Sequence, residues 1–223
     1  CPAPVAVTFP KTARSTDHYT LKGGGEELWE PHFTVHGFRY VELFGFPGIP
    51  TEETVTGIVI HSELPSTGTF ECSDPVINQL QHNIVWGQKG NFVDVPTDCP
   101  QRDERLGWTG DAQVFIRTAA FNMNVAGFFT KWTRDLEDAQ SSDGAYPAVA
   151  PNPSAWSIGD GGPAWADAGV ICPWTMHQCY GDIRLLEERY ASMQHFIEFL
   201  SRTSRDGLRC YAEYTGWHGF GDW

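Results

Sequence analysis

The sequence lacks several features that assign a chain to a broad class. No apolar run approaches the roughly 20 residues of a membrane-spanning helix, so we expect no membrane partner. Basic residues are few, because 15 Lys and Arg stand against 28 Asp and Glu, for a net charge of −13. A nucleic-acid binder needs a basic face, so this balance argues against nucleic acid. The start Cys-Pro-Ala-Pro-Val lacks the basic end and apolar block of a signal peptide, and a cytoplasmic or a secreted location stays open.

Cofactor and metal motifs are missing as well. The sequence has no glycine-rich phosphate loop, no dinucleotide fingerprint and no heptad run, so we expect no cofactor. The six cysteines form no Cys-x-x-Cys pair and no histidine lies at zinc-finger spacing, so we interpret them as buried or unpaired thiols. The chain also has no initiator Met and stops at Trp223. We therefore expect an internal piece of a longer protein.

Residues 1–69 have the composition of a β domain. Hydrophobic residues make up 41% of the chain, enough for a packed core. β-branched and aromatic residues predict strands over residues 5–9, 32–43 and 54–61, separated by turns rich in Gly and Pro. We interpret this part as the C-terminal part of an antiparallel β-sandwich domain.

Residues 70–223 have helical patterns. Apolar spacing predicts helices that begin at Ser73 and Asp111, span residues 125–139, follow Gly162-Pro163 and begin again at Asp182. Residues 141–162 are rich in Gly, Pro and Ser, which predicts a loop. We expect these helices to pair in turn around an axis, with the loops gathered at one end. This arrangement is that of the N-terminal part of an α/α barrel. Five helices do not close such a barrel, so we expect it to be incomplete in this chain.

The segment from Asp98 to Asp111 has the strongest chemical character in the chain. It reads Asp-Cys-Pro-Gln-Arg-Asp-Glu-Arg-Leu-Gly-Trp-Thr-Gly-Asp, with four carboxylates, two arginines and a tryptophan within fourteen residues. Acids and guanidinium groups hydrogen-bond hydroxyls, and an indole stacks on an apolar ring face. Such a segment favours a polar, uncharged ligand such as a sugar.

Individual roles follow from the local sequence. Glu104 is followed by Leu106, Gly107 and Trp108, and a carboxyl among apolar groups has its pKa raised, as a general acid requires. We expect Arg102 to lie close to Asp98 and keep it ionised. A salt-bridged structural loop is the alternative for the whole segment, and a helix N-cap is the alternative for Asp111. The acids lack the spacing of a calcium loop, so we predict no metal site.

The motif over residues 91–113, Asn-Phe-Val-Asp-Val-Pro-Thr-Asp-Cys-Pro-Gln-Arg-Asp-Glu-Arg-Leu-Gly-Trp-Thr-Gly-Asp-Ala-Gln, resembles the central motif of bacterial α-L-rhamnosidases of glycoside hydrolase family 78. The resemblance extends upstream to residues 31–42 and downstream to residues 143–147 and 163–167. It implies a β domain over residues 1–69, an (α/α)6-barrel domain from residue 70 to 223, and an inverting hydrolase that removes terminal non-reducing α-L-rhamnose. Rhamnose-terminated glycosides, such as plant glycosides or pectin fragments, are the implied partners.

The resemblance also implies roles for single residues. Glu104 is then the general acid, and the sugar contacts are Asp98, Arg102, Trp108, Asp111, Trp165 and Trp223. Trp217 competes with Trp223 for the last place, and core filling is the alternative for both Trp165 and Trp223. The family's general base is a late Glu that this chain does not reach. We assign no such role to Glu187, Glu188 or Glu198, whose helix pattern places them mostly in solvent, and we expect this piece alone to be inactive.

Two other functions stay open on the sequence alone. One is a carbohydrate-binding protein without catalysis, in which the acids only grip hydroxyls. The other is an α/α-barrel glycosidase for a different sugar.

Overall fold

The computed structural model describes residues 14–102, 104–153, 161–209 and 220. Five helices carry the fold: α1 (Pro75–Asn91), α2 (Thr109–Asn122), α3 (Ala126–Asp138), α4 (Ala168–Tyr180) and α5 (Ile183–Thr203). Two short antiparallel hairpins accompany them. The first joins β1 (Phe92–Val93) to β2 (Val95–Pro96), and the second joins β3 (Ser204–Arg205) to β4 (Leu208–Arg209). Within the described ranges, no helix combines the length and the apolar character needed to cross a membrane.

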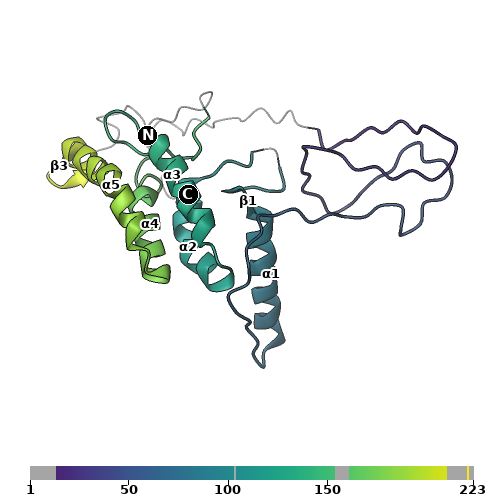
Figure 1. Cartoon of the computed structure of the whole chain (residues 1–223), viewed down its shortest axis with the longest axis horizontal. Coiled ribbons are helices and arrows are strands. Elements are labelled where there is room, and N and C mark those ends of the chain that lie inside the picture. The colour runs from purple at the N-terminus through teal and green to yellow at the C-terminus, as the bar shows by residue number, and fades with distance from the viewer. Residues whose placement is uncertain (1–13, 103, 154–160, 210–219, 221–223) are drawn as a thin grey trace.

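The N-terminal segment, residues 14–69, differs from the sequence prediction. It winds through extended loops on one side of α1 (Figure 1), and no strand forms over residues 32–43 or 54–61. The predicted strand over residues 5–9 lies outside the described residues. A strand needs a neighbour for its backbone N–H and C=O groups, and the described residues offer none here. The apolar side chains of these patterns consequently remain in solvent, with Phe33 fully exposed and Tyr40 86% exposed.

The helix boundaries follow from local capping chemistry. The Asp74 carboxylate accepts from the Val76 amide at 2.8 Å and caps α1, so the cap lies one residue after the predicted Ser73. Asp182 caps α5 as predicted, through the Leu185 amide at 3.2 Å. Asp111 is not a cap, because α2 begins at Thr109 and Asp111 lies in its first turn. That position leaves the Asp111 carboxylate available for another role.

Helices α2 to α5 pack around a core rich in aromatic residues. Helix α4 packs against α2, α3 and α5, while α3 also contacts α5. The apolar spacing over residues 125–139 predicted Phe128, Phe129, Trp132 and Leu136 on one face of a helix, and all four are buried in α3. Figure 1 shows α2 to α5 as a group, with α1 set apart on one side.

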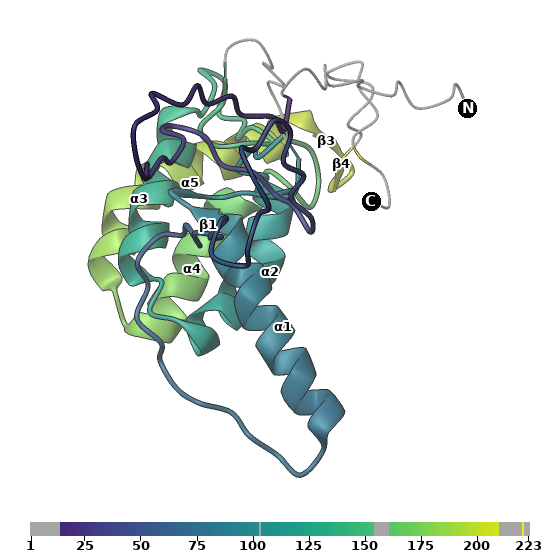
Figure 2. The same ribbon diagram turned by 90° about the vertical axis from the view of Figure 1, so that its right-hand side faces the viewer.

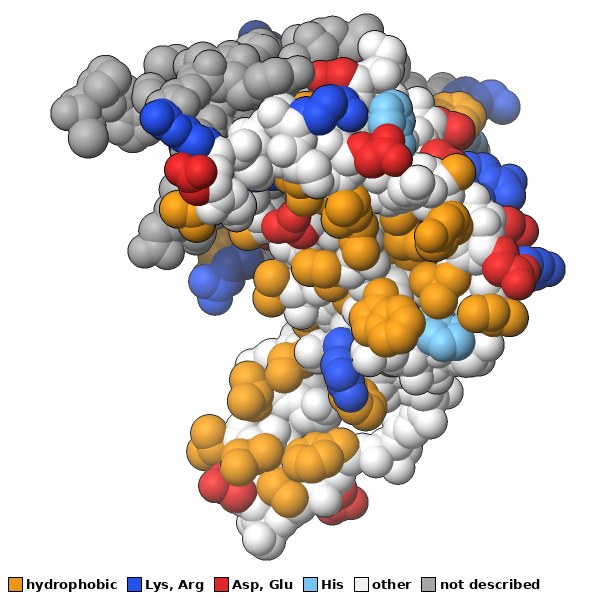
Figure 3. All heavy atoms as spheres, turned by 90° about the vertical axis from the view of Figure 1, so that its left-hand side faces the viewer, with side chains coloured by type: hydrophobic (Ala, Val, Ile, Leu, Met, Phe, Trp, Pro, Cys, Tyr) orange, Lys and Arg blue, Asp and Glu red, His pale blue; other side chains and the backbone are white. Residues whose placement is uncertain are grey.

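Helix α5 is amphipathic as predicted, but its buried face is rotated. The sequence pattern predicted one packed face, made of Ile183, Leu186, Tyr190, Met193, Phe196, Ile197 and Leu200. Phe196 is buried and Leu186, Met193 and Leu200 are half-buried, whereas Ile183, Tyr190 and Ile197 are exposed. The buried positions of the helix are Leu185, Arg189, Ser192, Phe196, Phe199 and Thr203. The helix has apolar residues on two faces, so periodicity alone did not separate them. Figure 3 accordingly shows hydrophobic side chains across much of the surface of the molecule on that side.

The linker between the N-terminal segment and α1 runs along the helical layer. It descends beside the helices, turns at their far end and enters α1 (Figure 2). Backbone bonds tie it to the end of α2, from Thr67 N to Asn122 O at 3.2 Å and from Asn124 N to Pro65 O at 2.7 Å. These bonds fix the course of the linker. The N-terminal segment thereby reaches the end of the helices at which the loop over residues 97–108 lies.

Candidate active site

The loop over residues 97–108 connects β2 to α2 and contains most of the predicted site. Its two limbs are joined by the bond from Asp98 N to Leu106 O at 3.1 Å. The second limb is clamped to the loop over residues 145–150, through Ala150 N to Gly107 O at 2.9 Å and Thr109 N to Ala148 O at 2.9 Å. A Cβ at Gly107 would lie 3.2 Å from the Ala150 carbonyl carbon and closer still to its oxygen. Glycine at 107 is therefore required for the clamp.

Glu104 projects inward from this loop. Only 7% of its side-chain surface is exposed, whereas Arg102, its ion-pair partner, is 43% exposed. One carboxylate oxygen, Oε2, lies 2.5 Å from Arg102 Nη2. The other, Oε1, accepts from the Trp108 indole N–H at 3.0 Å. Both oxygens of the Glu104 carboxyl group are thus oriented by residues of the same loop.

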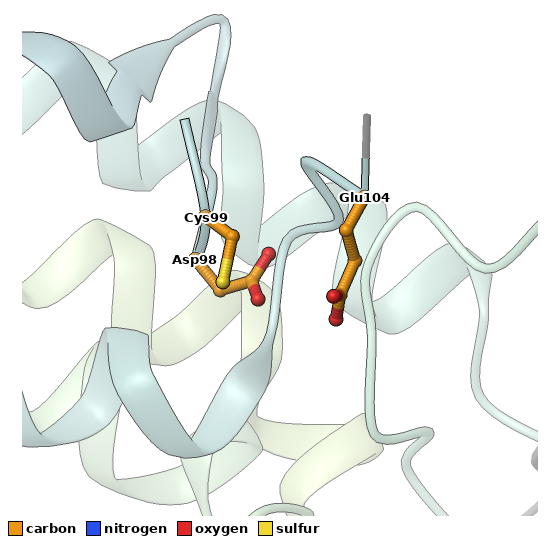
Figure 4. Close-up of side chains that lie close together, drawn as sticks. All are labelled: Asp98, Cys99 and Glu104. Carbon is orange, nitrogen blue, oxygen red and sulfur yellow. The ribbon is translucent and has the colours of Figure 1, made fainter. Parts of the chain in front are cut away.

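Asp98 faces Glu104 across the loop. The two carboxyl groups come from opposite limbs and turn toward the space between them (Figure 4), and their nearest oxygens lie within 4.8 Å. Arg102 makes its ion pair with Glu104, whereas the sequence predicted that it would hold Asp98. One oxygen of Asp98, Oδ1, is buried without a hydrogen-bond partner in the described part of the chain. A buried acceptor without a partner is costly, and a ligand hydroxyl would satisfy it.

The surroundings raise the pKa of Glu104 above its ordinary value. Burial is the largest cause, and the charge of Asp98 adds to it, while Arg102 and the indole hydrogen bond act in the opposite direction. A carboxyl with a raised pKa keeps its proton toward neutral pH, as a proton donor must. The electrostatics of the loop therefore suit Glu104 to the role of an acid.

A groove opens beside Asp98. It has a volume of about 570 Å³ and lies between α1 and the N-terminal turn of α2, with Asp98, Asp111 and Trp165 in its wall. Solvent reaches Asp111, but the concave wall displaces much of its hydration and raises its pKa, chiefly through burial. The Trp165 ring comes so close to α2 that a Cβ at Gly110 would lie 2.8 Å from it. Gly110 thus admits the indole into the groove.

Phe220 is a part of the site that the sequence analysis did not single out. Its ring lies 4.5 Å from that of Trp165 and 5.3 Å from that of Trp108, measured between centroids. The three rings form a continuous apolar surface beside Glu104. The nearest signal in the sequence was the Phe-Gly-Asp-Trp stretch at residues 220–223, in which only the tryptophan was considered.

The structure therefore gathers most of the predicted residues and leaves some outside. Asp98, Arg102, Glu104 and Trp108 form one cluster, and Asp98 shares the groove with Asp111 and Trp165. Asp103, Trp217 and Trp223 lie outside the described residues. Glu188 pairs with Arg189 on α5, and both Glu187 and Glu198 are exposed on that helix.

Asp98, Cys99 and Glu104 also present ligand atoms within 4.8 Å of one another, a geometry that would suit a cation. Burial, helped by Asp98, raises the pKa of the Cys99 thiol to about 11. A metal would bind the thiolate form, so its binding here would release the thiol proton.

Comparison with known proteins gives two family matches along the chain. Residues 65–223 match the bacterial alpha-L-rhamnosidase six-hairpin glycosidase domain, and residues 5–61 match the bacterial alpha-L-rhamnosidase concanavalin-like domain. The chain belongs to the bacterial α-L-rhamnosidases. It holds a short concanavalin-like segment followed by five helices of the six-hairpin glycosidase domain.

Relatives support this membership over nearly the whole chain. An α-L-rhamnosidase of Streptomyces avermitilis is 52% identical over 96% of this chain, and one of Formosa agariphila is 42% identical over 93%. The crystal structure of the Streptomyces avermitilis enzyme complexed with L-rhamnose covers 92% of the chain at 51% identity and a TM-score of 0.85. The α-L-rhamnosidase from Dictyoglumus thermophilum covers 77% at 47% identity and a TM-score of 0.74.

The rhamnosidase chain described here spans about a fifth of the length of these relatives, 20% and 22% for the first two. The concanavalin-like match covers residues 5–61. The strand patterns in residues 32–43 and 54–61 have no partner strands among the described residues.

Proposed function

We propose that the protein to which this chain belongs is an inverting glycoside hydrolase that releases terminal non-reducing α-L-rhamnose, with Glu104 as its general acid. The observation that carries the proposal is the environment of Glu104. Its carboxyl group is almost fully buried, is oriented by Arg102 and Trp108, and has a raised pKa beside a groove. A relative that is 51% identical was crystallised with L-rhamnose, which supports the choice of sugar.

The chemistry assigns a role to each residue of the site. Glu104 protonates the glycosidic oxygen as the bond to the sugar breaks. Asp98, through its unpartnered Oδ1, and Asp111, in the wall of the groove, accept hydrogen bonds from sugar hydroxyls, and Arg102 donates to them. Trp108 and Trp165 provide apolar walls for the deoxysugar. Its methyl group packs favourably against such a wall but cannot hydrogen-bond to polar side chains. Trp223, outside the described residues, remains a proposed wall residue.

We assign the general base to a different carboxylate from Asp98. An inverting pair stands about 6.5–9.5 Å apart, with a water molecule between the two groups. The nearest oxygens of Asp98 and Glu104 lie within 4.8 Å, which favours Asp98 as a charge partner for Glu104. We place the base in the four fifths of the relatives' length that this chain does not span. We further propose that the barrel domain, of the (α/α)6 type, begins at residue 70.

The test is Glu104→Gln in the full-length protein, with Glu198→Gln as the control. Glu198 is exposed on α5, and a hydrogen bond from Gln194 holds its side chain. Loss of a general acid costs about 10²- to 10⁴-fold, so cleavage of a rhamnosyl disaccharide should fall by that factor while rhamnose still binds. The control should retain the parent activity within twofold.

The outcomes separate this proposal from its rivals. Undiminished cleavage of the disaccharide by Glu104→Gln would reject Glu104 as the acid. Rhamnose binding without cleavage by the parent protein would instead indicate a carbohydrate-binding protein. Release of another sugar from a panel of p-nitrophenyl glycosides, with none from the rhamnoside, would indicate a different glycosidase.

A further inference from the structure

The acid loop, residues 97–108, has little regular structure of its own to hold it. Its internal polar contacts include Arg102 N to Cys99 O at 3.4 Å and Arg105 Nε to Pro100 O at 3.3 Å, both long. Arg105 adopts a positive φ of 43°, which is unfavourable for a residue with a side chain. The first limb of the loop therefore depends on neighbouring elements for its position.

Two glycines from other parts of the chain contact this limb. A Cβ at Gly37, in the N-terminal segment, would lie 2.8 Å from Pro100 O and closer still to the Gln101 Cα atom. On the other side, Gly90 of α1 faces the Pro100 ring, with 3.7 Å between its Cβ position and Cγ. Pro100 and Gln101 are thus held between α1 and the N-terminal segment, which lie on two sides of the loop (Figure 1).

The turn that carries Gly37 is itself anchored. His36 Nε2 lies 2.9 Å from Asp17 Oδ2, a bond that joins two parts of the N-terminal segment. The same segment is attached to the β1–β2 hairpin, where Ser62 N donates to Phe92 O at 2.8 Å. Gly37 therefore contacts the loop from a turn that is itself held in place. A larger residue at position 37 must displace either this turn or the loop.

We propose that Gly37 is a positioning residue, through which the N-terminal segment braces the acid loop and sets where Glu104 and Arg102 stand relative to the groove. This inference rests on the proposed function, because it gives Gly37 a part in proton donation by Glu104. Arg102 follows Gln101 directly in sequence, so a shift of the Gln101 backbone moves the guanidinium that holds Glu104. Misplacement of a catalytic group by about 1 Å can cost about 10²-fold in rate.

The test compares Gly37→Ala with Gly57→Ala in the full-length protein. Gly57 lies in the same segment, and a Cβ there would meet nothing within 4 Å. We expect Gly37→Ala to cleave a rhamnosyl disaccharide about 10- to 100-fold more slowly in kcat, and Gly57→Ala to stay within twofold of the parent. The loss should be smaller on an aryl rhamnoside with a good leaving group, because such a substrate needs less protonation. The alkaline limb of the pH–rate profile should also move, because burial and the charge of Arg102 both set the pKa of Glu104 and a displaced loop changes both.

Equal losses on both substrates with an unmoved alkaline limb, or no loss at all, would overturn the proposal. If Gly37→Ala fails to fold, His36→Ala decides, because it removes the bond to Asp17 that anchors the turn carrying Gly37 and adds no bulk beside the loop. It should show the same leaving-group dependence at a smaller magnitude, and the absence of that dependence would also overturn the proposal. Glu104→Gln is measured alongside: full activity there rejects the acid itself, whereas an inactive Glu104→Gln with an unaffected Gly37→Ala rejects only the brace.

Discussion

The hydrogen bond from Trp108 to Glu104 offers a direct test of how the site sets its acidity. In Trp108→Phe the indole N–H that lies 3.0 Å from Glu104 Oε1 is lost, while an aromatic ring remains to face Phe220. The N–H stabilises the charged carboxylate more than the protonated acid. Its removal should therefore raise the pKa of Glu104 further.

The magnitude follows from ordinary hydrogen-bond energies. A hydrogen bond to a charged group contributes about 1.5–3 kcal/mol and one between neutral groups about 0.5–1.5 kcal/mol. The difference of about 1–1.5 kcal/mol corresponds to about one pH unit, at about 1.36 kcal/mol for each unit. Solvent screening removes little of it, since the Glu104 side chain is only 7% exposed.

The assay is the pH dependence of kcat/KM on a rhamnosyl disaccharide, measured with the full-length protein. The alkaline limb reports the pKa of the acid in the free enzyme, so Trp108→Phe should move it upward by about one unit while lowering the plateau. Trp174→Phe, on the exposed surface of α4, is the matched control and should leave the limb in place. If the alkaline limb of Trp108→Phe does not move, or moves to lower pH, the electrostatic account of Glu104 is refuted.

Two other substitutions test the charge balance and the clamp. Asp98→Asn removes a charge that raises the pKa of Glu104, so the alkaline limb should move to lower pH, opposite to the tryptophan variant; an upward shift would contradict this. Gly107→Ala adds a Cβ against the Ala150 carbonyl; overpacking of this kind costs about 1–3 kcal/mol, so the melting midpoint should fall. Gly127→Ala on α3, where nothing lies within 4 Å, should leave the midpoint unchanged or slightly higher.

The sequence predicted the helical part well because its signals are local. The carboxylate of Asp182 caps the helix that follows it, and the apolar spacing of α3 matches the face that is buried. The prediction was wrong where a choice depended on distant partners. Helix α5 offers two apolar faces, and the rest of the fold decides which of them packs. The strand patterns in residues 32–43 and 54–61 likewise need neighbouring strands, and none lies among the described residues.

The composition of the acid loop predicted a sugar site, but not which charges would pair. Arg102 was expected to hold Asp98 and holds Glu104 instead. Since residues 98, 102 and 104 are neighbours in sequence, either pairing satisfies the spacing. Only the course of the backbone decides between the two pairings. Here the chain turns back so that Leu106 O accepts a hydrogen bond from Asp98 N.

That course depends on three glycines that have no chemistry of their own. Gly107 lets the loop over residues 145–150 approach the second limb, and Gly110 lets the Trp165 ring approach the first turn of α2. Gly37 lets the N-terminal segment approach the first limb. At each position a single Cβ would collide with a neighbour at 3.2 Å or less. A sequence shows a glycine but not what fills the space beside it, so the acids could be found by composition and their support could not. The raised pKa of Glu104 depends on these contacts, because burial is its largest cause. Glu104 is buried because the three glycines let the neighbouring segments pack closely around the loop.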